Sequence, residues 1–224
     1  MIEAVLFDLD GTLLDREKSL IAFVSHQYDR LAPKLSNISK ELYISRFIDL
    51  DKNGYVWKDI VYDQLIQEFH LTDCTVKELL DDYVINFKHY CIPFRYLHQM
   101  LNELTQLNIK IGMITNGFGQ FQLDNIQALG IEHKFDVILI SEWEGLKKPN
   151  PEIFNRALAK LQVSATNSMF VGDHAINDIE AAQNMGMKAV WKRNDASPTQ
   201  KADYIIHELD EIPMLVQQLV TSQK

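Results

Sequence analysis

The chain has 224 residues, of which 46% are hydrophobic and 24% are charged, enough for one sizeable core and a small accessory domain. Its formal net charge of −9 at pH 7 argues against binding to nucleic acid or to an anionic membrane. No apolar run approaches the roughly 18 residues that cross a bilayer, the first residues lack the basic region of a signal peptide, and Cys74 and Cys91 form no CxxC motif, so we expect a cytoplasmic protein without a zinc or redox site.

The chain opens on a short apolar run, residues 2–7, that ends in two carboxylates one residue apart, Asp8 and Asp10. Such a run is typical of a strand that is buried on both faces. Open α/β sheets bind their ligands at the C-terminal ends of these strands. Because two carboxylates this close disfavour joint ionisation, they require a shared proton, a metal ion or both. The opening stretch therefore predicts a functional site as well as a strand.

Residues 16–92 carry apolar side chains at helical spacing and show no clear strand. We expect about four helices in this segment, joined by loops such as residues 51–54. Because it is inserted directly after the first strand, the segment is expected to lie over the strand ends and to act as a lid. The predicted domains are an α/β core of residues 1–15 and 93–224 and a helical cap of residues 16–92.

From Pro93 onward, helical and extended patterns alternate along the chain. The pattern predicts strands at residues 109–114, 135–140, 168–171, 188–191 and 203–206. The helices expected between them are one over residues 97–104, one ending at Gly130, one beginning at Pro151, one from about Asp178 to Gly186, and a terminal helix capped by Asp210. Alternating strands and helices with short connections predict a doubly wound parallel sheet of the α/β class.

Polar residues stand at the ends of the first four predicted strands, and such ends converge on one crevice. Four carboxylates, a hydroxyl, an amide and a lysine are available there: Asp8, Asp10, Thr115, Asn116, Lys148, Asp173 and Asp178. Hard oxygen ligands favour Mg²⁺, which leaves coordination positions for a substrate phosphate, and the lysine and the hydroxyl suit the other phosphate oxygens. A carboxylate can attack phosphorus, and a second acid can protonate the leaving group.

In order and spacing, these residues resemble the four motifs of the haloacid dehalogenase (HAD) superfamily. The matching segments are Asp8-Leu9-Asp10-Gly11-Thr12, Thr115-Asn116, Lys148 before Pro149, and Val171-Gly172-Asp173 with Asn177-Asp178. The resemblance covers essentially the whole chain and implies a Rossmann-like α/β core. The helical segment between the first two motifs resembles the small α-helical cap of the phosphatase branch.

The resemblance implies a role for each catalytic residue. Asp8 is then the nucleophile, and Asp10 is the general acid and base. Thr115 and the Asn116 amide would hold phosphoryl oxygens. Lys148 would neutralise both the nucleophile and the transferring phosphoryl group.

The resemblance also implies a Mg²⁺ site. Its expected ligands are Asp8, the backbone carbonyl of Asp10, and Asp173, with Asp178 completing the shell directly or through water.

Within the helical segment, Tyr55, Trp57 and Lys58 follow a flexible loop and are candidate contacts to the substrate.

The function implied by the resemblance is Mg²⁺-dependent hydrolysis of a small phosphorylated metabolite through an aspartyl-phosphate, by a monomer or homodimer. A nucleoside monophosphate and a sugar phosphate are the first candidate substrates. An acid at Asp10 suits ester cleavage because the leaving oxygen needs a proton, whereas dehalogenases of this superfamily lack an acid there and need no metal. A phosphomutase, a dehalogenase and a catalytically silent binding protein remain as alternatives.

Overall fold

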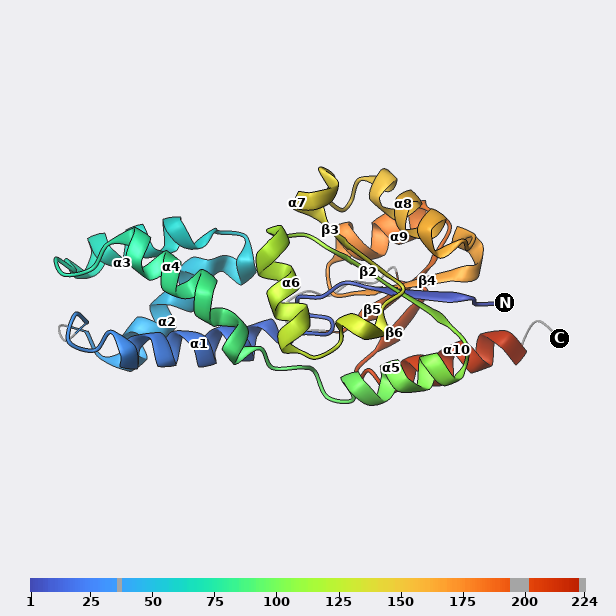
Figure 1. Cartoon of the computed structure of the whole chain (residues 1–224), viewed down its shortest axis with the longest axis horizontal. Coiled ribbons are helices and arrows are strands. Elements are labelled where there is room, and N and C mark those ends of the chain that lie inside the picture. The colour runs from blue at the N-terminus through green and yellow to red at the C-terminus, as the bar shows by residue number, and fades with distance from the viewer. Residues whose placement is uncertain (36–37, 194–201, 222–224) are drawn as a thin grey trace. The chain divides into compact units, whose positions relative to one another are not determined.

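The computed structural model describes residues 1–35, 38–193 and 202–221 (Figure 1). The chain divides into two compact units, one formed by Met1–Asp15 with Pro93–Lys224 and the other by Arg16–Ile92. The first is an α/β unit and the second is helical. Among the described residues, no helix combines the length and the apolar character that a membrane span requires.

The α/β unit is built on a parallel sheet whose six described strands stand in the order β3-β2-β1-β4-β5-β6. The strands are β1 (Ala4–Phe7), β2 (Lys110–Thr115), β3 (Val137–Ile140), β4 (Ser168–Gly172), β5 (Lys188–Lys192) and β6 (Tyr204–Ile206). Every residue of β1 and β4 is buried, as expected for central strands that are covered on both faces. The predicted doubly wound parallel sheet is therefore confirmed.

Helices cover both faces of this sheet (Figure 1). They are α5 (Leu97–Gln106), α6 (Gly119–Ala128), α7 (Ser141–Glu144), α8 (Pro151–Leu161), α9 (Ala181–Asn184) and α10 (Glu211–Thr221), with 3₁₀ turns at Glu132–Lys134 and Ala165–Asn167. On one face α8 packs against β2 and β3 and α9 against β5, whereas α5 and α10 pack together on the other. The first face encloses a core that includes Leu6, Phe154, Phe170 and Trp191.

Local signals explain where two of these helices begin and end. Asn150 caps α8 by accepting a hydrogen bond from the Glu152 N–H at 2.9 Å, and Pro151 occupies the first helical position, where its missing N–H costs nothing. After α6, Gly130 adopts a φ of +68°, the left-handed conformation that commonly ends a helix.

One expected helix start is corrected. The helix predicted from about Asp178 begins earlier, with a π-helical turn at Ala175–Glu180, because the His174 Nδ1 accepts the N–H groups of Ile176 and Asn177 and caps it. At the start of α10, the backbone N–H groups of residues 207 and 208, which precede the helix, donate to the Glu211 carboxylate in its first turn.

The helical unit contains α1 (Arg16–Arg30), α2 (Lys40–Asp51), α3 (Lys58–Phe69) and α4 (Val76–Asn86), with 3₁₀ turns at Lys52–Gly54 and Phe87–Tyr90. Aromatic side chains form much of its core, and Phe47 stacks edge-on against Tyr62 with ring centroids 5.4 Å apart. The buried Gln27 accepts hydrogen bonds from the hydroxyls of Tyr43 and Tyr62, so these three buried polar side chains are paired.

Candidate active site

The candidate site lies where the sheet reverses its winding direction. The chain moves from β1 to β2 on one side and reaches β4 on the other side of β1. Asp8 follows β1 and donates its backbone N–H to the Val171 carbonyl of β4 at 2.9 Å, and Asp173 follows β4. Open α/β sheets bind ligands in the crevice at such a switch point. The topology therefore brings the first and fourth predicted motifs together.

Three acids form a cluster at this point. Asp8, Asp173 and Asp178 each offer a carboxylate oxygen, and these oxygens all lie within 4.8 Å of one another. Two glycines allow the approach: a Cβ on Gly11 would collide with the Asp173 carboxylate, and a Cβ on Gly172 would collide with the Asp178 side chain. Carboxylate oxygens this close are suited to a hard divalent cation.

Lys148 lies between two of these acids. Its Nζ is 2.7 Å from Asp8 Oδ1 and 2.7 Å from Asp178 Oδ1, and only 2% of the side chain is exposed. Burial on its own would lower the lysine pKa, but Asp178 and Asp8 raise the pKa to about 12. Lys148 is therefore charged at neutral pH although it is buried. The neighbouring Lys147, in contrast, has an exposed side chain.

Burial and the charge of Lys148 act in opposite directions on the pKa of Asp8. Burial raises the pKa of Asp8 well above its usual range, Lys148 opposes this shift, and Asp178 and Asp173 add to it. A cation bound among the three acids would further favour the ionised form of Asp8. The site is thus built to control the charge of one carboxylate at the end of β1.

Asn116 holds Lys148 in place through its backbone. The Asn116 side-chain amide donates to the Lys148 carbonyl at 3.0 Å, and its Oδ1 accepts the Lys148 N–H at 2.9 Å. Because the side-chain amide is used in this way, the backbone N–H is the group of Asn116 that fits the predicted contact to a phosphoryl oxygen.

Asp10 and Thr115 meet through a residue that the sequence analysis missed. The Gln122 Nε2 is 2.7 Å from Asp10 Oδ2 and 2.7 Å from Thr115 Oγ1. The three-acid cluster does not include Asp10, so the backbone carbonyl remains the group of Asp10 that is expected to meet a metal. No sequence signal marked Gln122, because one glutamine in an amphipathic helix resembles a surface residue.

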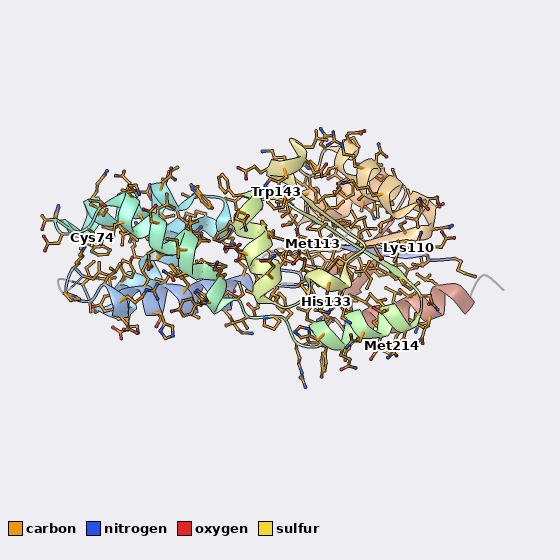
Figure 2. The ribbon with its side chains drawn as sticks, in the orientation of Figure 1. Cys74, Lys110, Met113, His133, Trp143 and Met214 are labelled. Atoms are coloured by element: carbon orange, nitrogen blue, oxygen red, sulfur yellow. The ribbon has the colours of Figure 1, made fainter. Side chains whose placement is uncertain are left out.

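The loop after β2 is fixed by the short helix α7, which was also not predicted. The Ser141 hydroxyl accepts the Gly117 N–H at 2.9 Å, and the Glu142 carboxylate accepts the Gly119 N–H at 2.6 Å. Figure 2 shows Trp143 on α7, where its ring occupies the space that a Cβ on Gly119 would need. The residues that follow Asn116 are therefore anchored to the end of β3.

The predicted substrate contacts Tyr55, Trp57 and Lys58 belong to the helical unit. Tyr55 is 72% exposed, and the Trp57 ring packs edge-on against Tyr83. Lys58 is buried and ion-paired with Asp51, which also accepts two hydrogen bonds from Arg16. Of the three, Tyr55 is the one with a largely exposed side chain.

Comparison with known proteins gives consistent relatives. The family model described as haloacid dehalogenase-like hydrolase matches residues 5–192. The glyceraldehyde 3-phosphate phosphatase of Pyrococcus abyssi is 29% identical over 222 residues, which cover 85% of this chain and 81% of that protein. The enzyme of the same name from Pyrococcus furiosus is 27% identical and covers 94% of this chain and 91% of its own length.

A solved structure of a phosphatase also resembles this chain. The HAD phosphatase from Thermococcus onnurineus has a TM-score of 0.68 and 29% sequence identity, over 96% of this chain and 98% of that one. The likeness extends over nearly the full length of both chains.

Proposed function

The chain belongs to the haloacid dehalogenase-like hydrolases, and we propose that it is a Mg²⁺-dependent phosphatase that cleaves a small phosphomonoester through an aspartyl-phosphate on Asp8. Its phosphatase relatives place it among the hydrolases of this family. The observation that carries the proposal is the position of the Lys148 Nζ, 2.7 Å from both Asp8 and Asp178, beside a third acid.

The three-acid cluster fits Mg²⁺. All three donors are carboxylate oxygens, and one lysine does not balance their charge. Asp8, Asp173 and Asp178 would hold the ion, the last directly or through water, together with the Asp10 carbonyl. When bound, the ion supplies positive charge to the carboxylates and to the phosphoryl oxygens.

In the first step, an oxygen of Asp8 attacks phosphorus, and the bond from phosphorus to the leaving oxygen breaks. Asp10 gives its proton to that oxygen, so the alcohol departs neutral. Lys148 balances the charge of Asp8 before the attack and that of the phosphoryl group during it. The products of the step are the free alcohol, the aspartyl-phosphate on Asp8 and an ionised Asp10.

In the second step, Asp10 takes a proton from water, and the water oxygen attacks phosphorus. The bond from phosphorus to Asp8 breaks, and inorganic phosphate leaves. Both carboxyl groups return to their starting states. Through both steps the Thr115 hydroxyl and the Asn116 backbone N–H would bind phosphoryl oxygens.

A small sugar phosphate is the first substrate class to test, with nucleoside monophosphates next. Two relatives that match most of the chain are named glyceraldehyde 3-phosphate phosphatases, which supports a short phosphorylated sugar. In this proposal residues 16–92 form the cap domain, and Tyr55, Trp57 and Lys58 contribute to substrate selection.

The test is phosphate release from a panel of sugar phosphates and nucleoside monophosphates, with and without Mg²⁺. We expect Mg²⁺-dependent release that Asp8→Asn abolishes, while the exposed neighbour of the catalytic lysine, altered as Lys147→Met, keeps the activity. A requirement for a sugar bisphosphate activator would indicate a phosphomutase, and metal-independent halide release would indicate a dehalogenase. If no phosphoester is cleaved and Asp8→Asn has no effect on ligand binding or turnover, the proposal is wrong.

A further inference from the structure

Gln122 on α6 connects two functional groups of the site. Its side chain is buried, with the residue 2% exposed. The amide nitrogen Nε2 lies 2.7 Å from Asp10 Oδ2, 2.7 Å from Thr115 Oγ1 and 3.4 Å from the Asn116 carbonyl. A buried amide with three acceptors around its nitrogen is held in one place.

The orientation of this amide is fixed from the other side as well. The fully buried Asn125, one turn further along α6, donates from its Nδ2 to Gln122 Oε1 at 3.3 Å. Because of this contact, the oxygen of the Gln122 amide faces Asn125 and its nitrogen faces Asp10. Gly117 makes room for the arrangement, because a Cβ there would lie 2.8 Å from Gln122 Cγ.

We propose that Gln122 is a positioning residue that orients the Asp10 carboxyl for proton transfer and the Thr115 hydroxyl toward the phosphoryl group. The proposal rests on the function proposed above. A carboxyl group has two oxygens, and Gln122 binds Oδ2, which leaves Oδ1 to carry the proton to the leaving group. Thr115 Oγ1 accepts a hydrogen bond from the same amide. The hydrogen of the Thr115 hydroxyl therefore points away from Gln122 and can be donated to the phosphoryl oxygen. Gln122 itself neither gives nor takes a proton.

The two roles of Gln122 can be separated by the choice of leaving group. An alkyl phosphate has a strongly basic leaving oxygen that needs the proton of Asp10, whereas 2,4-dinitrophenyl phosphate releases a stable anion that does not. A misplaced Asp10 therefore slows the first substrate and spares the second. A misplaced Thr115 hydroxyl slows both substrates alike.

The experiment compares kcat/KM for glycerol phosphate and for 2,4-dinitrophenyl phosphate in Gln122→Met, which keeps the side-chain length and removes the donor. General acid catalysis contributes about 10²- to 10⁴-fold, and we expect this variant to lose roughly 10- to 100-fold more on the alkyl than on the aryl substrate. The ratio of the two values does not depend on the fraction of folded enzyme. If Gln122→Met is insoluble, the same ratio is measured on Gln122→Asn.

Asp10→Asn and Gln127→Met serve as controls. Gln127 is an exposed glutamine on the same helix, and its replacement should leave the ratio unchanged. Combining Gln122→Met with Asp10→Asn should change the ratio no further than Asp10→Asn does. An equal loss on both substrates in Gln122→Met, with a selective loss in Asp10→Asn, overturns the role of Gln122 at Asp10 and leaves the proposed function intact. Unchanged activity on both substrates overturns its role at Thr115 as well. If Asp10→Asn shows no selective loss, the proton role of Asp10 fails, and the role of Gln122 fails with it.

Discussion

In the described part of the chain, Lys148 is the cation that two buried carboxylates, Asp8 and Asp178, share. Replacing it as Lys148→Met leaves Asp8 and Asp178 facing each other without a counter-charge. We expect kcat to fall by about 10²- to 10³-fold, the usual effect of losing one electrostatic contact to the transition state. The loss of one partner from a buried ion pair should also lower the free energy of unfolding by about 3–5 kcal/mol. Phosphate release and urea unfolding measure the two effects, and a variant that is as active as Lys147→Met would contradict this assignment.

Gly11 gives a test of the acid cluster that changes no ligand. Its φ is +82°, and a Cβ would collide with the Asp173 carboxylate, so Gly11→Ala should move that ligand and weaken Mg²⁺ binding by 10-fold or more (~1.4 kcal/mol). Gly130→Ala is the matched control, because its φ is +68° and a Cβ there meets nothing within 4 Å. Both variants carry backbone strain, but only Gly11→Ala should alter the Mg²⁺ affinity measured by calorimetry. Equal Mg²⁺ affinities in the two variants would refute the steric explanation.

At this scale the sequence predicted the residues at the strand ends better than those that support them. Asp8 and Asp173 were proposed because polar groups that directly follow apolar strands stand out, and Lys148 was proposed because of its position before Pro149. Gln122 and Asn116 act through contacts that depend on how α6 and the residues before Pro149 fold back toward β1. Such contacts join segments far apart in the chain, so no local pattern indicates them.

Among the elements of the helical unit, α2 and α3 are joined by a buried ion cluster. Although burial tends to raise the pKa of Asp51, Arg16 and Lys58 hold that pKa below its ordinary value of 3.8. Below pH 3.8 the unfolded chain therefore binds a proton that the folded chain does not, and stability falls as the pH falls through this range. Above it, the cluster contributes its full stability.

Asp51→Asn should remove this contribution. The variant leaves Lys58 buried without its carboxylate, so we expect a loss of about 3–5 kcal/mol at pH 7. The difference between wild type and variant should shrink as the pH falls below 3.8. Urea unfolding at pH 3, 5 and 7 measures this, with exposed Asp63→Asn as the control. A difference that stays constant over this range would show that Asp51 is not ionised in the cluster.

The elements were predictable where an apolar pattern was long and ended in a clear signal, as for α8 between Asn150 and Gln162. The predicted strand 135–140 is shorter in the structure because the Asp136 side chain accepts the Ile111 N–H at 2.7 Å, and β3 starts only at Val137. The π-helical turn at Ala175–Glu180 has no periodic pattern, and its cap is a histidine, so its start could not be predicted.

Across the whole molecule, the site exists only when distant parts of the chain are folded together. Asp8 follows the first strand, whereas Asp173 follows the fourth strand and Asp178 lies in the turn after it. The alternation of strands and helices was sufficient to predict this assembly, because a doubly wound sheet brings all of its strand ends to one edge. An unfolded chain cannot offer the same cluster to a cation. Metal binding and folding should therefore be coupled.

This coupling predicts that Mg²⁺ stabilises the fold. A ligand that binds only the folded state at 100 times its dissociation constant adds about 2.7 kcal/mol, which for a chain of this size raises Tm by roughly 5–10 °C. We expect this rise when Mg²⁺ replaces EDTA during thermal unfolding of the wild type. Asp173→Asn should abolish the rise, because one of the three clustered ligands is lost, whereas Glu132→Gln, at an exposed acid of the same unit, should retain it. A Tm that does not respond to Mg²⁺, or that responds equally in Asp173→Asn, would show that the cluster is not the metal site.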